Sequence, residues 1–199
     1  MSRGIPISQI LARTVILATF LGVGQPVRLN SNAGQSAALD LSGSAVDPLK
    51  ATPGKVVVLI FVRTDCPVSN RYSPTIQRLS AQHVGKAMFW LVYPDKTESA
   101  EKIRQHERDF GYRLPALRDL QHTLVKESRV QITPEAAVFD ANHRLVYHGR
   151  IDNLYQDFGR SRNLPTTHEL DDAIQAAASG KAVPVENVPA VGCYISDLE

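Results

Sequence analysis

A single cysteine, Cys66, stands where an apolar segment meets a proline-marked helix start. Residues 55–62 form a near-continuous apolar run, which is typical of a strand buried on both faces. Pro67 follows directly, and a first helical turn tolerates proline because its missing N–H would have no partner there. Cys66 is therefore expected at a helix N-terminus, where free N–H groups and the helix dipole lower the pKa of a thiol. This is the position of a reactive thiol; a small buried core cysteine is the alternative interpretation.

The charges around Cys66 act in both directions. Asp65 would raise the pKa of the thiol, whereas Arg63 and Arg71 would lower it. The only other cysteine is Cys193, 193 − 66 = 127 positions further along the chain. Two cysteines make neither a disulfide scaffold nor a structural zinc site. One bridge between them would be compatible with an oxidising compartment.

The composition is that of an ordinary globular protein of one main domain. The 199 residues are 43% hydrophobic and 21% charged, and the net charge of +2 gives no reason to expect a nucleic-acid partner. The N-terminal end differs, because two arginines there precede an apolar stretch at residues 14–24. This pattern predicts a signal peptide or an N-terminal membrane anchor over residues 1–24, followed by a linker over residues 25–38. The protein is therefore expected to be exported, either periplasmic or anchored facing outward.

The remaining chain alternates between strand and helix patterns. Strands are expected at residues 39–43, 55–62, 87–93, 114–119 (as an edge strand), 136–140 and 144–148, the last two as a hairpin. Helices are expected at 66–83, 97–109, 120–128 and 170–178. Pro74 should break the first helix near residues 72–73, Thr97 should cap the second, and Thr166 with Glu169 should form a capping box for the last. This order predicts an α/β domain with a central mixed sheet and helices on both faces.

Three segments in this order resemble the thioredoxin-like redoxins, the superfamily of alkyl hydroperoxide reductase and thiol-specific antioxidant proteins. They are Val57-Val-Leu-Ile-Phe-Val-Arg-Thr-Asp-Cys-Pro67, Phe110-Gly-Tyr-Arg-Leu-Pro-Ala-Leu-Arg-Asp119 and Val130-Gln-Ile-Thr-Pro-Glu-Ala-Ala-Val-Phe-Asp140. The resemblance covers about residues 39–180 and implies a thioredoxin-like fold. It also implies a cis peptide bond before Pro134, packed against Cys66, in a loop that meets a partner thiol or peptide.

The resemblance implies a thiol-dependent oxidoreductase that acts on a protein disulfide or on peroxide, with no cofactor and no metal. Its site residues are expected to be the nucleophile Cys66, the hydroxyls of Thr64 and Ser69, Cys193 as the resolving thiol, and Pro67, Thr133 and Pro134 on the partner-binding side. Cys193 lies in the expected tail, residues 181–199, within an apolar island that should return to the domain. We therefore predict that Cys193 lies within reach of Cys66.

The chain also departs from the family in ways that keep other functions open. Ser69 stands where thioredoxin-like reductases have a second cysteine, and Arg63 and Leu59 stand where peroxiredoxins have Thr or Ser and Pro. A thioredoxin-fold binding module that has lost catalysis is one alternative. A copper-binding assembly protein is a weaker one, because Asn70 replaces the second cysteine of that motif and the six histidines, expected to be solvated or capping residues, lack ligand spacing.

Overall fold

The computed structural model describes residues 38–196 and residue 198. The leader expected over residues 1–24, and the linker expected over 25–38 except for Ala38, lie outside the described residues. Within the described part of the chain, none of the helices combines the length and the apolar character that a membrane crossing requires. The account below concerns the domain formed by the described residues.

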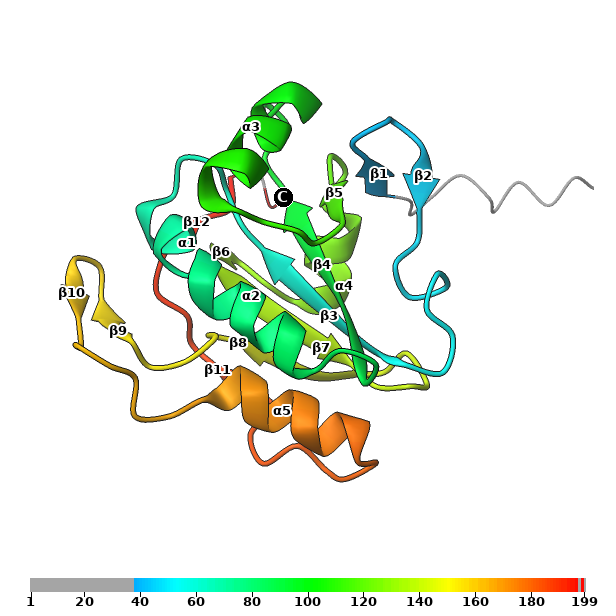
Figure 1. Cartoon of the computed structure of the whole chain (residues 1–199), viewed down its shortest axis with the longest axis vertical. Helices are drawn as coiled ribbons and strands as arrows, with labels where there is room; N and C mark the ends of the chain where they lie inside the picture. Colours follow the sequence, from blue (N-terminus) through cyan, green and yellow to red (C-terminus); the bar gives the residue numbers. More distant parts are fainter. Residues whose placement is uncertain (1–37, 197, 199) are drawn as a thin grey trace, which may run out of the picture. The chain divides into compact units, whose positions relative to one another are not determined.

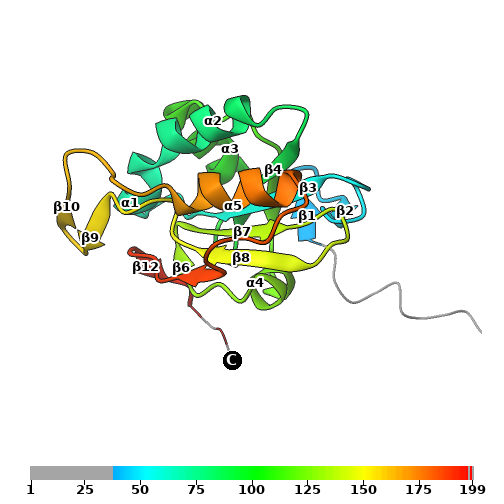
Figure 2. The same cartoon turned by 90° about the horizontal axis from the view of Figure 1, so that it is seen from below.

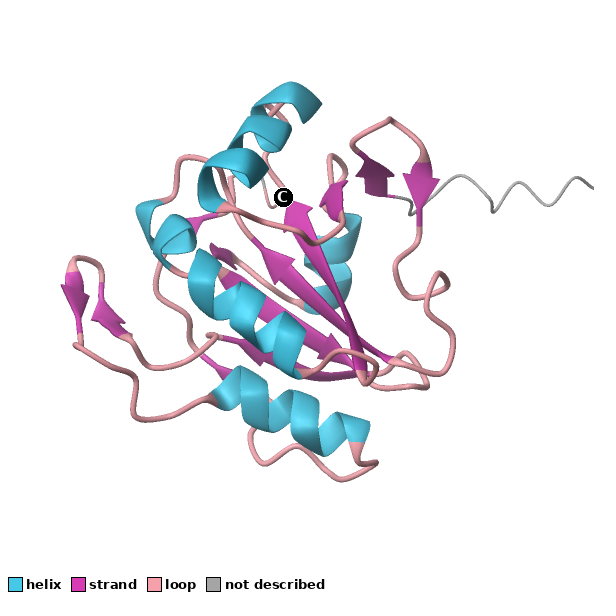
Figure 3. Ribbon diagram, viewed as in Figure 1, coloured by secondary structure: helices cyan, strands magenta, loops and turns pink. Residues whose placement is uncertain are grey.

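The elements follow one another much as the sequence pattern predicts (Figures 1 and 3). The helices are α1 (Pro67–Arg71), α2 (Ser73–Gln82), α3 (Ala100–Phe110), α4 (Thr123–Ser128) and α5 (Glu169–Ala178). The strands are β1 (Ala38–Asp40), β2 (Ala45–Val46), β3 (Val56–Phe61), β4 (Ala87–Tyr93), β5 (Ala116–Arg118), β6 (Ile132–Thr133), β7 (Glu135–Phe139), β8 (Leu145–Gly149), β9 (Tyr155–Asp157), β10 (Arg160–Ser161), β11 (Asn187–Val188) and β12 (Cys193–Tyr194).

One mixed sheet organises the domain, in the strand order β11-β8-β7-β3-β4-β5-β1-β2. The strands β3, β4 and β5 run parallel, and β7 is antiparallel to both β3 and β8. All six residues of β3 are buried, which agrees with its unbroken apolar sequence. The strand β5 was expected at an edge and is internal, because β1 pairs with its outer side and β2 extends the sheet further.

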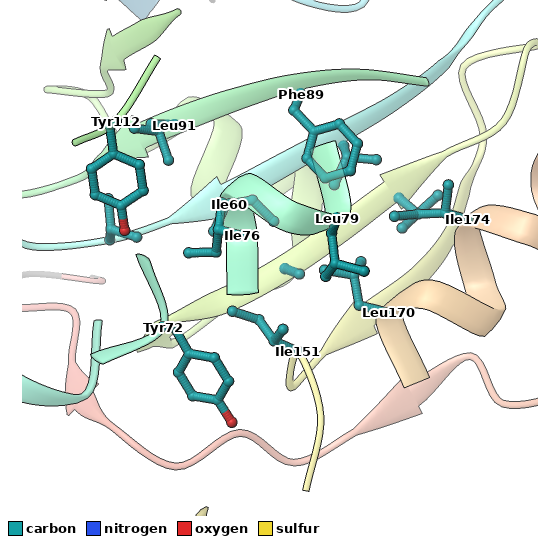
Figure 4. Close-up of a cluster of buried hydrophobic side chains, with 14 of the residues drawn as sticks. Ile60, Tyr72, Ile76, Leu79, Phe89, Leu91, Tyr112, Ile151, Leu170 and Ile174 are labelled. Atoms are coloured by element: carbon teal, nitrogen blue, oxygen red, sulfur yellow. The ribbon is translucent and has the colours of Figure 1, made fainter. Parts of the chain in front are cut away.

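Helices cover both faces of this sheet (Figure 2). Because successive side chains of a strand point to opposite faces, β3 supplies two separate cores. Val58 and Ile60 belong to the core beneath α1, α2, α3 and α5, and Leu59 belongs to the core beneath α4. Figure 4 shows side chains of the first core, among them Ile60, Ile76, Leu79, Leu170 and Ile174. The predicted fold class is confirmed.

The helix that follows β3 is broken as predicted. The helix α1 ends at Arg71 and α2 begins at Ser73, with Tyr72 between them at φ −81° and ψ −6°. Pro74 lies in the first turn of α2, where its missing N–H leaves no hydrogen bond unmade. The break keeps α1 to one and a half turns, so that the α1 N-terminus and the longer α2 are positioned separately.

Both expected side-chain caps are wrong. Ser99, not Thr97, caps α3, because the Thr97 hydroxyl donates to the Asp95 carboxylate (Oγ1 to Oδ1, 2.7 Å) and Ser99 Oγ accepts from the Lys102 amide (3.1 Å). The helix α5 begins at Glu169, whose carboxylate binds Arg150 rather than the start of the helix (3.1 Å from Nε). A carboxylate with a guanidinium partner is not free to complete a capping box.

The tail expected at residues 181–199 is built into the domain at two places. The strand β11 joins the main sheet in parallel with β8, and β12 pairs with β6 in a separate two-stranded ladder. The first attachment requires Gly149, which has a φ of +144° and whose added Cβ would lie 2.2 Å from the Val188 carbonyl oxygen. The two attachments bring the end of the chain back to the loop that carries Pro134.

Candidate active site

Cys66 lies at the junction between β3 and α1. It is the N-cap residue of α1, in extended conformation (φ −86°, ψ 111°), and Pro67 occupies the first turn. Its side chain is completely buried. The thiol donates a hydrogen bond to the Thr133 carbonyl oxygen, 3.1 Å from Sγ. The strand and the proline thus fix Cys66 at the helix N-terminus that the sequence predicts.

Thr133 and Pro134 form the other wall of the site. The peptide bond between them is cis. Thr133 is the last residue of β6, and Pro134 directly precedes β7, which pairs with β3 in the centre of the sheet. This pairing holds the loop against the end of β3, so that the Thr133 carbonyl meets the Cys66 thiol.

The tail brings Cys193 to the same place. The strand β12 lies beside β6 (Figure 2). The two strands run antiparallel, with Cys193 opposite Thr133. The Thr133 hydroxyl donates to the Cys193 carbonyl (3.3 Å), and the Ile195 amide donates to the Gln131 carbonyl (2.9 Å). Cys193 also packs against the core cluster that contains Cys66. The two cysteines, 127 positions apart (193 − 66), are therefore neighbours, and both are free thiols.

Gly192 permits this close approach. A Cβ added to Gly192 would lie 2.0 Å from the Thr133 carbonyl oxygen and 2.7 Å from the carbonyl carbon. Both are backbone atoms, which cannot move aside as a flexible side chain would. The role of Gly192 is therefore to leave space for the backbone of Thr133.

The two thiols are inequivalent. Burial alone would raise the pKa of Cys66, but hydrogen bonds from the Cys193 thiol, the Ser69 hydroxyl and the Ser69 and Cys193 backbones lower that pKa below the ordinary thiol value. Burial and the neighbouring Cys66 together raise the pKa of Cys193 to about 12. When the pair loses one proton, it is therefore lost from Cys66 rather than from Cys193.

Ser69 stabilises this thiolate from within α1. Its side chain is fully buried, and its hydroxyl has no hydrogen-bond partner while Cys66 keeps its proton. The thiolate provides that missing partner, and donation from Ser69 contributes to the lowered pKa of Cys66. A buried hydroxyl without a partner is costly, so ionisation of Cys66 removes a local penalty.

Replacing Ser69 by alanine is therefore expected to raise the pKa of Cys66. Replacing Cys193 by alanine should raise that pKa further, because the Cys193 thiol is the strongest of the stabilising donors. The measurement is thiolate absorbance near 240 nm against pH, taken as the difference from a Cys66→Ala protein. An unchanged midpoint in Ser69→Ala would show that the hydroxyl does not reach the sulfur.

Glu98 binds both the backbone amide and the hydroxyl of Thr64. Its backbone amide donates to the buried carboxylate of Glu98 (2.8 Å), and its hydroxyl donates to the same oxygen. Burial raises the pKa of Glu98, although the Thr64 hydrogen bonds oppose this. Thr64 thus shapes the loop before Cys66 and does not contact the sulfur through its hydroxyl.

Arg63 and Asp65, two of the charges that flank Cys66, pair with each other. The Arg63 guanidinium pairs with Asp65 at 3.1 Å and with Asp95 at 3.2 Å. It also reaches the Tyr194 carbonyl of β12 at 3.5 Å. Arg63 therefore links the loop before Cys66 to the tail, and Asp65 is not a free charge that opposes the thiolate.

A series of hydrogen bonds between buried polar side chains connects α3 to the loop before Cys66. Tyr93 Oη lies 2.9 Å from His106 Nδ1, and His106 Nε2 lies 2.8 Å from Asn70 Oδ1. The Asn70 amide then donates to the Thr64 carbonyl at 3.2 Å. Burial lowers the pKa of His106 to about 4, so the imidazole is neutral at physiological pH.

This hydrogen-bonded chain was not predicted, and the expectation that the histidines are solvated or capping residues is wrong for His106, which is buried within α3. His83 and His122 are also buried, but they occupy the C-cap of α2 and the N-cap of α4. The spacing of His106 after Ile103 and before Phe110 places it on the inner face of α3, a signal that the sequence does contain. Within the described residues, no group of three or more His, Cys, Asp or Glu side chains could hold a metal ion.

Comparison with known proteins agrees with this architecture. Residues 54–145 match a family model described as thioredoxin-like. No curated protein sequence matches the chain. The solved structures do include similar folds. An uncharacterized conserved protein from Geobacillus kaustophilus is 22% identical over 80% of this chain and 87% of its own, with a TM-score of 0.69.

Two similar structures come from secreted or surface-exposed redox proteins. The exposed lipoprotein thioredoxin of Streptococcus pneumoniae is 18% identical, over 72% of this chain and 97% of its own, with a TM-score of 0.52. A secreted Mycobacterium tuberculosis disulfide oxidoreductase, homologous to the DsbE protein of E. coli, is 18% identical over 73% and 96%, with a TM-score of 0.50. Together with the match to the family model over residues 54–145, these similarities show that the described domain has a thioredoxin-like fold.

Proposed function

We propose that the protein is an exported thiol–disulfide oxidoreductase in which Cys66 and Cys193 alternate between two thiols and one internal disulfide. The observation that carries this proposal is that both cysteines meet Thr133, whose carbonyl accepts from the Cys66 thiol and which pairs with Cys193 across β6 and β12. Cys66 lacks a second cysteine in its own helix, since Ser69 stands there. The tail strand β12 delivers the missing thiol from another part of the chain.

The assigned chemistry is thiol–disulfide exchange. The Cys66 thiolate attacks one sulfur of a partner's disulfide and forms a mixed disulfide, and the partner's other sulfur leaves as a thiolate. Cys193, after losing its proton to water, then attacks Cys66 Sγ. This step releases the reduced partner and leaves the Cys66–Cys193 disulfide. An external dithiol returns the pair to the reduced state.

The surroundings of Cys66 favour a disulfide over a peroxide as the substrate. The groups that lower the pKa of Cys66 are Cys193 and Ser69. The Thr64 hydroxyl is occupied by Glu98, and Arg150 is occupied by Glu169. Among the described residues, Arg63 is also held by carboxylates. The hydroxyl and guanidinium that would hold a peroxide are thus engaged elsewhere.

The first test is intact mass after oxidation of the full chain with a small disulfide. The wild-type protein is expected to lose two mass units and to resist alkylation at both cysteines. The Cys193→Ser variant should instead retain a mixed disulfide on Cys66, because its resolving thiol is missing. A wild-type protein that keeps two alkylatable thiols after oxidation would contradict the proposal.

The complete burial of Cys66 favours a second candidate, a binding module without turnover. In that case the tail would cover an inert thiol, and the surface formed by β6 and β12 would serve only for partner binding. The pKa of Cys66 separates the two candidates. An ordinary or raised pKa in the folded protein supports the module, and a lowered one supports the enzyme.

Export is proposed on two grounds. The basic and apolar pattern of residues 1–24 resembles a leader, and two of the similar structures come from proteins described as secreted or exposed. An oxidising compartment also suits a protein that cycles through a disulfide. Protein disulfides outside the cytoplasm are the proposed partners, with the leader as signal or anchor.

A further inference from the structure

The two sulfurs of the proposed disulfide differ in their exposure to solvent. Cys66 is 0% exposed, because α1, the Pro134 loop and β12 surround it. Cys193 is only partly buried, and the next residue, Tyr194, is 75% exposed. The two thiols already interact, so joining them requires little rearrangement of β12. The difference in exposure should therefore persist in the oxidised protein.

From this geometry we propose that Cys193, not Cys66, is the sulfur that an external thiol attacks when the internal disulfide is reduced. The inference rests on the proposed function and assigns the entry point for the reductant. It reverses the roles expected from the sequence, where Cys66 is the residue that partners meet. In the first step of reduction, the external thiolate attacks Cys193, and Cys66 is the leaving group.

The chemistry of the two sulfurs supports the same direction. Thiol–disulfide exchange is faster when the sulfur that leaves has the lower pKa, because it carries the negative charge away more easily. In the oxidised protein Cys193 has no thiol proton to donate, but the Ser69 hydroxyl and backbone amide still stabilise a thiolate that leaves at Cys66 and lower its pKa. Attack on Cys193 expels the better leaving group, whereas attack on Cys66 would expel the worse one. Access to the sulfur and leaving-group ability therefore both favour attack on Cys193.

Reduction of the internal disulfide by a dithiol takes place in two exchange steps. The first thiolate of an external dithiol forms a bond to Cys193 Sγ, the Cys66–Cys193 bond breaks, and its electron pair leaves on Cys66 as a thiolate. The dithiol's second thiolate then attacks its own first sulfur and expels Cys193, which takes a proton from water. The dithiol loses two electrons and becomes a disulfide, and the protein gains two and becomes the dithiol form.

The partner that fits this entry point presents an accessible thiolate and needs no deep access to the domain. The solvent-exposed Tyr194 side chain lies beside the reacting sulfur, and Arg63 holds the Tyr194 carbonyl. A small thiol or the exposed active-site cysteine of a reducing protein can reach Cys193 while β12 remains paired with β6. The Cys66 side chain stays enclosed throughout the first exchange.

The test traps the first mixed disulfide. The full chain is oxidised, its internal disulfide is verified by the loss of two mass units, and it is mixed briefly with glutathione. The reaction is stopped in acid, and free thiols are then blocked with N-ethylmaleimide in denaturant. Trypsin separates the two cysteines, because Arg63 and Arg71 flank Cys66 and Lys181 precedes Cys193. Mass spectrometry then locates glutathione on one peptide and the maleimide on the other.

We expect glutathione on Cys193 at least tenfold more often than on Cys66. The same experiment in denaturant is the matched control, and there the preference should fall to a few-fold because both sulfurs are exposed. Glutathione mainly on Cys66, equal labelling, or an equally strong preference in denaturant would overturn the inference while leaving the proposed function intact. Failure to form the internal disulfide would overturn both, and the mass measurement identifies that outcome first.

Discussion

Replacing Gly192 by valine is expected to expose Cys66 and to raise its alkylation rate in the folded protein by up to about 1000-fold. A side chain at this position collides with the Thr133 backbone, since even its Cβ would lie 2.0 Å from the carbonyl oxygen. The strand β12 must then leave β6. Because β12 covers Cys66, its departure opens the route to the sulfur.

The size of this effect follows from what holds β12 in place. Hydrogen bonds to Gln131, Thr133 and Arg63 contribute roughly 0.5–1.5 kcal/mol each. Burial of the Ile195 side chain adds about 1.5–3 kcal/mol. Fixing the backbone of residues 193–195 costs about 1 kcal/mol of conformational entropy for each residue, which offsets part of this stabilisation. The remaining net attachment, up to about 4 kcal/mol, protects Cys66 by a factor of up to about 1000.

The measurement uses iodoacetamide and compares Gly192→Val/Cys193→Ala with Cys193→Ala, so that Cys66 is the only thiol. Each rate is divided by the thiolate fraction obtained from absorbance, which removes any change in pKa. Val185→Ala in the same background is the control, because Val185 is an exposed residue of the same tail. Equal rates in all three proteins would mean that β12 does not protect Cys66.

Oxidation of the Cys66–Cys193 pair should raise the free energy of unfolding by up to about 5 kcal/mol. The bridge would close a loop of 193 − 66 = 127 residues, and the chain-entropy model assigns about this value to a loop of that length. The stabilisation arises because the bridge removes extended conformations from the unfolded chain. Guanidinium unfolding of the oxidised and the reduced full chain at the same pH gives the difference directly.

Cys193→Ser provides the control for this prediction, since an oxidant cannot form the internal bridge in that variant. Its unfolding midpoint should be the same with and without oxidant and close to that of the reduced wild-type protein. An oxidised wild-type protein with a confirmed bridge but no gain in stability would show that the bridge strains the native domain. Such a result would contradict the easy closure inferred from the position of β12.

The part of the site nearest to Cys66 could be predicted because its signals are local. An apolar run, a cysteine and Pro67 together specify a strand end and a helix start, and Pro74 breaks the following helix. Pro134 also stands directly before a buried strand, β7. Each of these features depends on residues within a few positions of one another, so short-range conformational rules are sufficient.

The rest of the site depends on contacts between distant parts of the chain. The sequence predicted that Cys193 would come near Cys66, but not that it would do so as a strand in register with Thr133. The role of Gly192 depends on the Thr133 backbone, which lies 59 positions away in the sequence (192 − 133). The hydrogen bond from the Thr64 hydroxyl to the buried Glu98 carboxylate was likewise not predicted. Such competition between partners is decided only once the chain is folded.

The attachment of β11 to the central sheet also limits how far Cys193 can travel. Val188 is held beside Gly149, and only 193 − 188 = 5 residue steps separate it from Cys193. When β12 detaches, Cys193 therefore stays within a radius of about 17 Å, at about 3.4 Å per residue. One thiol within a sphere of that radius corresponds to a local concentration on the order of 0.1 M around Val188. A dissolved thiol at millimolar concentration is far less abundant there, so in the proposed exchange a partner bound to Cys66 would be released mainly by the tethered Cys193.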